Sequence, residues 1–181
     1  MSKWAITGIV IGAVFSTSWS GDFDYASYTQ TTLQNIIMEE QEDNKAQVSD
    51  KKPAPDFQLE CKIAKYRVSC RYSNDLRPIS EKKKSLIMGW MEMFKFDTKF
   101  ASLYKQEIRV SEGTSEHWIP IQEQLLPHIK QELDTNDRIE LFIIVLGRVE
   151  SEIVFIATEY EKPNAPVKNS LRATASLRAG Y

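Results

Sequence analysis

Residues 138–147 read RIELFIIVLG, and this stretch decides the fold. It begins with alternating polar and apolar residues and then stays apolar on both faces from Leu141 to Leu146. Alternation is typical of a half-buried strand, whereas a short apolar run fits a strand that is covered on both sides. Residues 152–158 (EIVFIAT) repeat this character after a turn at 147–151. The two segments therefore predict a β-hairpin at the centre of a covered or closed sheet.

A helix is predicted immediately before this hairpin, within residues 122–133 (QEQLLPHIKQEL). Its apolar residues recur at helical spacing, at Leu125, Leu126, Ile129 and Leu133. Proline fits the first turn of a helix but not its interior. We therefore expect one turn before Pro127 and the main helix starting there.

Three further strands are expected upstream of the helix, at residues 85–94 (SLIMGWMEMF), 105–110 (KQEIRV) and 116–121 (EHWIPI). The last two are joined by a turn that contains Gly113. The order strand, strand, strand, helix, strand, strand is that of an OB-type five-stranded barrel. The sequence thus predicts a β-rich α+β fold with a small OB-like barrel, and an SH3-like barrel or an open α+β sheet is the alternative.

The two cysteines predict a disulfide-linked hairpin at the start of the domain. Cys61 and Cys70 each occupy an apolar position of an alternating segment in FQLECKIAKYRVSCRY (57–72). A turn around Lys65 and Tyr66 would place them opposite each other, at a separation suited to a disulfide. Two buried free thiols are the alternative. The spacing of the cysteines and of His117 and His128 does not match a zinc site, so no metal is expected.

The first twenty residues predict export. A single cation at Lys3 precedes an apolar run from Trp4 to Phe15, which is short for crossing a bilayer. Small residues at Ser18 and Ser20 resemble a signal-peptidase site, so we expect cleavage after Ser20 and a periplasmic or secreted protein of the bacterial envelope. An uncleaved inner-membrane anchor with the domain outside the cytoplasm, or a buried helix, is the alternative.

Composition divides the remaining chain into three parts. Residues 21–56 are acidic overall and combine a short helix on Leu33, Ile36 and Ile37 with a proline-containing flexible linker. Residues 57–161 form the compact β-rich domain, whose length suits a single core. Residues 162–181 contain bases and no acid, and they predict a disordered basic tail.

A resemblance covers roughly residues 85–160. The order of HWIPIQEQLLPHIKQEL, IELFIIVLG and VFIATEY resembles a group of uncharacterised bacterial exported proteins. The shared pattern falls on Trp118, Pro120, Gln122, Leu125, Leu126, Pro127, Leu133, Leu141, Gly147, Phe155, Glu159 and Tyr160. This resemblance implies export and a small β-rich domain, and it implies no activity.

Two sets of residues are candidates for a site. Trp118, Pro120 and Gln122 are candidates for a ligand groove, although a tryptophan beside a proline at a strand end more often belongs to a core. A basic face for an anionic partner is the second candidate, made of Lys62, Lys65, Arg67, Arg71, Lys82, Lys83 and Lys84. A solvated strand face is the simpler explanation of these bases.

The sequence predicts a non-enzymatic interaction module with no cofactor. It contains no glycine-rich phosphate loop, no GxSxG, no HExxH and no paired CxxC, and we assign no catalytic residue. The expected partner is an unidentified protein or envelope component, and a membrane is involved only if the N-terminal segment is retained. The alternative is an anion-binding module for a lipid head group, an envelope polyanion or, less favoured, nucleic acid; an enzyme with an unfamiliar site comes third.

Overall fold

The computed structural model describes residues 23–47 and 57–163. The predictions for the export segment, for most of the linker and for nearly all of the basic tail lie outside these residues. The elements in chain order are η1 (Tyr25–Ser27), β1 (Thr29–Thr31), α1 (Leu33–Gln47), β2 (Phe57–Pro78), α2 (Glu81–Met93), η2 (Thr98–Leu103), β3 (Tyr104–Glu112), β4 (Ser115–Gln122), η3 (Glu123–Leu125), α3 (Leu126–Glu132), β5 (Arg138–Val149) and β6 (Glu152–Glu161).

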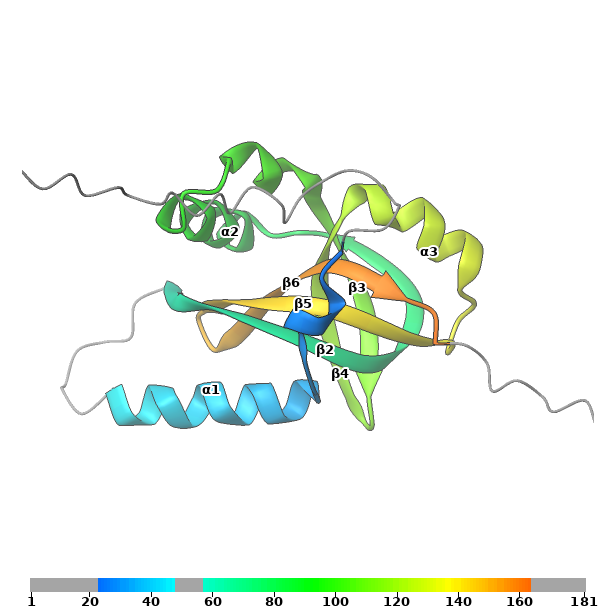
Figure 1. Cartoon of the computed structure of the whole chain (residues 1–181), viewed down its shortest axis with the longest axis horizontal. Helices are drawn as coiled ribbons and strands as arrows, with labels where there is room; N and C mark the ends of the chain where they lie inside the picture. Colours follow the sequence, from blue (N-terminus) through cyan, green and yellow to red (C-terminus); the bar gives the residue numbers. More distant parts are fainter. Residues whose placement is uncertain (1–22, 48–56, 164–181) are drawn as a thin grey trace, which may run out of the picture.

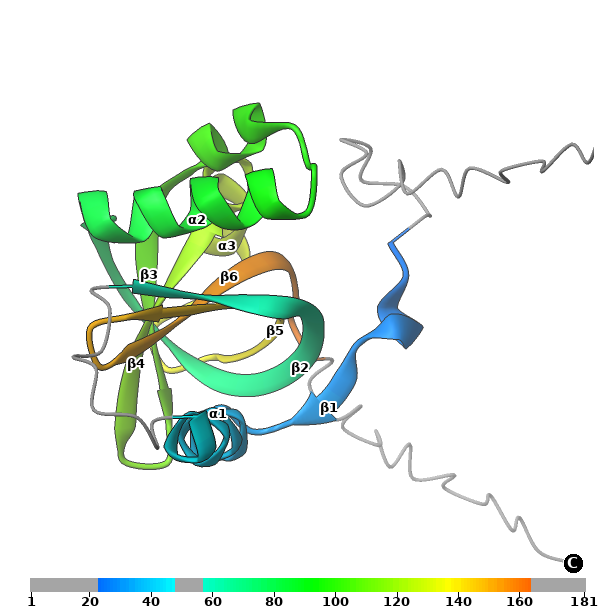
Figure 2. The ribbon, with the colours of Figure 1, turned by 90° about the vertical axis from the view of Figure 1, so that its left-hand side faces the viewer.

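The six strands form one mixed sheet in the order β1-β2-β3-β4-β6-β5, and β2 also pairs with β5. Five strands, β2 to β6, therefore form a ring of pairings. The neighbours in the ring are antiparallel except for β4 and β6, which are parallel and share one register pair, Ile121 with Ala157. Figure 1 shows α1 on one side of the strands and α2 on the other, and Figure 2 shows the same arrangement after a quarter turn. The α+β, strand-rich class predicted from the sequence is confirmed.

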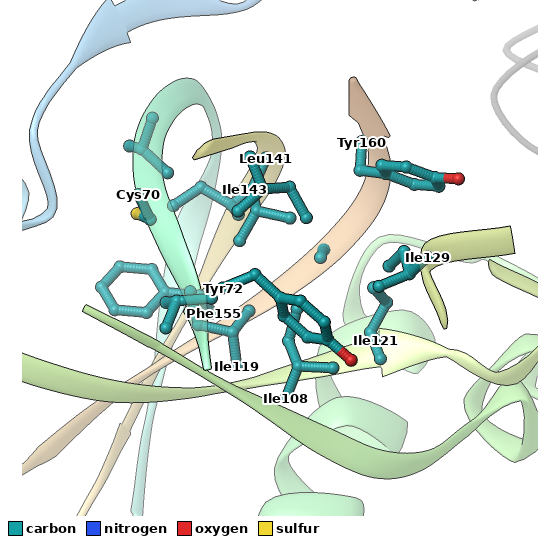
Figure 3. Packing of buried hydrophobic residues seen from close by; sticks show 14 of the residues in the cluster. Cys70, Tyr72, Ile108, Ile119, Ile121, Ile129, Leu141, Ile143, Phe155 and Tyr160 are labelled. Atoms are coloured by element: carbon teal, nitrogen blue, oxygen red, sulfur yellow. The ribbon is translucent and has the colours of Figure 1, made fainter. Parts of the chain in front are cut away.

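Two apolar clusters hold the fold together. The first lies inside the ring, where residues such as Ile108, Ile119 and Ile143 meet (Figure 3). Leu33 and Ile36 of α1 belong to the same cluster. The second lies on the opposite face of β5, where α2 packs against the sheet. Because β5 contributes alternate residues to both clusters, it is apolar on both faces, as the sequence predicted.

The prediction of a hairpin with a turn at Lys65 and Tyr66 is wrong. Residues 57–78 form one continuous strand, β2, which pairs with β5 along most of its length and with β3 at its end. Leu59 packs against the cluster beneath α2, whereas Val68, Cys70 and Tyr72 pack inside the ring, so odd and even positions of β2 face two different apolar clusters. The β2–β5 register shifts between Leu59 and Ala64, and the strand continues through Lys65 and Tyr66 without a chain reversal.

The predicted disulfide is wrong for the same reason. Cys61 and Cys70 lie on one strand, where a rise of about 3.3 Å per residue separates them far beyond bonding distance. Both thiols are free. Cys61 is exposed, and Cys70 is buried in the cluster inside the ring (Figure 3).

The strand predicted at 85–94 is also wrong, because this segment belongs to α2. Ser80 caps the helix by accepting the backbone N–H of Lys83, and Glu81 lies in the first turn. The buried residues of α2 recur at helical spacing, at Leu86, Ile87, Trp90 and Met91. The first strand of the ring is therefore β2, and the compact part of the chain includes β1 and α1, upstream of the predicted boundary at Phe57.

Within the described ranges, no helix combines the length and the apolar character that crossing a bilayer requires.

Candidate functional site: a groove between β4 and β6

The ring is open where β4 and β6 diverge. The two strands pair only at Ile121 and Ala157, so β4 has no strand beside this edge from Ser115 to Pro120 within the described residues. A groove of about 210 Å³ lies there. Its apolar lining comes from Ile37 of α1 and from Ile153 and Phe155 of β6. The geometry thus combines an open strand edge with an apolar floor.

His117 supplies the unusual polar group of this groove. Its side chain is half-buried and lines the groove, yet its Nε2 atom is shielded from solvent and has no hydrogen-bond partner among the described residues. Burial lowers the pKa of His117 below its ordinary value, although the carboxylates of Glu112 and Glu152 partly oppose this effect. A neutral imidazole nitrogen can donate or accept a hydrogen bond, depending on its tautomer. His117 therefore lines the groove with a ring whose buried Nε2 is left unsatisfied by the described residues.

An ion network fixes the rim of the groove. Lys83 donates to Glu107 at 2.5 Å and to Glu152, which lines the groove, at 2.7 Å. Arg77 donates to the other carboxylate oxygen of Glu107 at 2.6 Å. Since Lys83 and Glu107 are almost fully buried, this network ties α2, β2, β3 and β6 into one rigid unit.

Trp118 lines the groove, and the guanidinium groups of two arginines lie over its ring. The guanidinium carbon of Arg77 is 4.3 Å from the ring centroid, and that of Arg109 is 6.0 Å away. Arg109 also pairs with Glu116, which lines the groove. Stacked arginine and tryptophan side chains are typical of residues that dominate binding at interfaces.

The three predicted groove residues do not share one environment. Trp118 lines the groove, whereas Pro120 and Gln122 are buried further along β4. The amide of Gln122 donates to the hydroxyl of Tyr104 at 3.3 Å. Trp118 is therefore part of the candidate site, while Gln122 has a structural role.

The predicted basic face is divided between two elements. Lys62, Lys65, Arg67 and Arg71 lie on β2, and Lys82, Lys83 and Lys84 lie on α2. Carboxylates pair with Arg67, Lys82, Lys83 and Lys84. Lys65 lies over the ring of Tyr28. Because internal pairing offsets most of this charge, the residues do not form one continuous cationic surface.

The groove also brings Ser151 close to His117, which raises the question of catalysis. A serine nucleophile needs a hydrogen bond to its base. No such bond joins Ser151 to His117 in the described part of the chain, and Nε2 has no partner there. The arrangement fits ligand binding better than acyl transfer.

Residues 23–47 and 57–163 do not contain a group of three or more acidic, histidine or cysteine side chains placed to hold a metal ion.

Sequence reasoning missed the contribution of α1, since Ile37 and Gln41 form one wall of the groove. It also missed Glu107, which is a buried acid in the middle of a strand. Pro120 was an available signal, because proline within a strand favours an edge position. In comparisons with known proteins, no family model and no curated protein matches the chain.

Proposed function

We propose that this protein is a non-enzymatic interaction module that binds an extended segment of a partner protein in the groove between β4 and β6. The observation that carries the proposal is the single register pair between these strands, which leaves an edge of β4 beside an apolar groove. An unpaired strand edge offers N–H and C=O groups to an added strand. The floor around Phe155 would receive an apolar side chain of the partner.

The size of the groove supports a peptide side chain as its occupant. At about 210 Å³, it is smaller than the roughly 300–1,000 Å³ of typical small-molecule sites. The ring of His117 would form part of the wall around the partner's side chain, and Trp118 with its arginines would form the contact at the rim. The ion network beneath them would keep the surface rigid and so limit the entropy lost on binding.

We further propose that the ring is an OB-type barrel that works outside the cytoplasm. The ring order, the parallel pairing of β4 with β6 and the position of α3 between β4 and β5 support the barrel. The export part of the proposal rests on residues 1–20 of the sequence. Mass spectrometry of the mature N-terminus tests it, and a native chain that retains Met1 in the soluble cell interior would overturn it.

Site-specific photocrosslinking in cells tests the groove. A photoreactive amino acid replaces Gln41, which lines the groove, or Lys130, which is exposed on α3 and serves as the control position. We expect a crosslinked protein partner from position 41 and none from position 130. The same band from both positions, or from neither, would contradict the proposal.

Blocking the groove provides the matched control. Ser151→Arg fills the groove from the β5–β6 turn, whereas Thr114→Arg places the same side chain on the β3–β4 turn. Both positions are exposed, so both variants should fold. We expect only Ser151→Arg to abolish the crosslink from position 41.

A further inference from the structure

A row of three residues crosses the sheet on β3, β2 and β5, away from the β4–β6 groove. Arg71 of β2 lies opposite Ser111 of β3 on one side and opposite Arg138 of β5 on the other. Directly opposed residues share one face of a sheet, so the three side chains project the same way. Ser69, two residues before Arg71, joins them on this face. The four residues line a cavity of about 300 Å³.

Neither guanidinium in this cavity has a carboxylate partner within the described residues. Arg71 donates to the carbonyl oxygen of Asn136 at 3.2 Å, and Arg138 donates through Nε to the Ser69 hydroxyl at 2.7 Å. The neighbouring acids have other partners, since Glu140 of β5 pairs with Arg67, and Asp137, just before β5, pairs with Lys162. Like charges directly opposite each other destabilise a sheet. An anion between the two arginines would remove this cost.

Glu112 is the carboxylate that lines the same cavity, and its charge is already offset. Its two oxygens each accept a backbone N–H, from Leu33 and from Gln34, at 3.0 Å. These donors belong to the first turn of α1, where the helix dipole is positive. Glu112 therefore caps α1 and leaves both arginines to an incoming ligand.

We infer that this cavity binds a phosphate group. Two arginines match the charge of about −1.5 to −2 that a phosphate monoester carries at neutral pH, and their planar forks fit its oxygens. The Ser69 hydroxyl accepts from Arg138, so its own hydrogen is available to a phosphate oxygen. Ser111 provides a second hydroxyl on the opposite side of Arg71. The volume suits a small phosphorylated molecule or the head group of a phospholipid.

Titration of the full-length chain with inorganic phosphate, followed by NMR at constant ionic strength, tests this inference. We expect saturable shifts of the backbone resonances of Ser69, Arg71, Ser111 and Arg138. The Arg71→Gln/Arg138→Gln variant should bind about tenfold more weakly or not at all. Lys130→Ala removes a cation from α3 and should bind as the wild type does. Arg138→Lys keeps the charge and loses the fork, so intermediate binding is expected.

Vesicle binding distinguishes the two possible sources of the phosphate group, a small soluble molecule and a phospholipid head group. The probes are vesicles of phosphatidylcholine with and without phosphatidic acid. Binding of inorganic phosphate without vesicle binding identifies a small soluble ligand, whereas binding to phosphatidic acid that is lost in Arg71→Gln/Arg138→Gln identifies a head group. Both results support the site. The inference is overturned if neither probe binds, or if the double variant binds them as tightly as the wild type.

Discussion

Lys83 and Glu107 form an ion pair whose side chains are only 4% and 1% exposed. Lys83 reaches Glu107 from the first turn of α2, and Arg77 holds the second carboxylate oxygen from β2. The pair therefore joins the helix to the outer face of the ring beneath the rim of the β4–β6 groove. Breaking a buried pair leaves an uncompensated charge, which costs much more than breaking a surface pair.

Lys83→Met should lower the free energy of unfolding by up to about 3–5 kcal/mol, because Glu107 would lose its buried partner and keep only the more exposed Arg77. Lys82→Met is the matched control, since Lys82 pairs with Glu150 in an exposed position and its loss should cost about 1 kcal/mol or less. Urea denaturation of both variants measures the difference. Equal stability of the two variants would contradict the structural role of Lys83.

Gly147→Ala should destabilise the protein by more than about 4 kcal/mol. Gly147 has a φ of +135°, and a Cβ atom there would lie 2.0 Å from the carbonyl oxygen of Gln58 on the neighbouring strand. Gly113→Ala is the control, because its φ of +60° is strained but the space around it is open, so we expect about 1–2 kcal/mol. Thermal and urea denaturation compare the two. A small effect at Gly147 would show that β2 and β5 are not so closely paired there.

The two thiols should react at very different rates in the native protein. Cys61 is exposed, whereas burial raises the pKa of Cys70 to about 12 and so suppresses its thiolate form. We expect one thiol per chain to react rapidly with a thiol reagent, and the second thiol to react only after unfolding. Cys61→Ser should remove the fast phase. If the unreduced, denatured protein released no thiol, a disulfide would exist after all.

Stability should fall as the pH drops below the ordinary histidine value of 6.5. Burial lowers the pKa of His117, so the unfolded chain binds a proton at a higher pH than the folded protein does. The stabilisation from neutral His117 is present above pH 6.5 and is lost as the pH falls through the folded-state pKa. His117→Gln should weaken this dependence in urea denaturation at pH 5 and pH 8, whereas His128→Gln should retain it. An unchanged dependence in His117→Gln would show that this side chain is not shielded.

Local patterns predicted the second half of the fold well. The expected strands at 105–110, 116–121, 138–147 and 152–158 correspond to β3, β4, β5 and β6. Pro127 lies in the first turn of α3, with the 3₁₀ turn η3 before it. These elements were predictable because each has a clear period and a clear turn signal at its ends.

The first half of the fold was harder to predict, because two of its sequence patterns each fit more than one structure. Residues 85–94 are apolar enough for a strand, and the capping serine that favours a helix lies outside that window, at Ser80. The apolar positions near Leu59 are out of phase with those at Val68 and Cys70. This fits either a turn or a single strand that faces an apolar cluster on each side, and local sequence does not distinguish them. The groove depends on contacts between α1, β4 and β6, which are distant in sequence, so its composition could not be predicted.

Strand β2 pairs with β1, β3 and β5, so one segment of chain sets three registers at once. An insertion of a single residue near Val68 would turn the side chains of three ladders to the wrong face together. Relatives of this protein should therefore tolerate changes in length at the exposed turns near Gly113 and Glu150, and hardly at all within β2. The same logic makes β2 a poor place to split the chain into complementing fragments, and those two turns good ones.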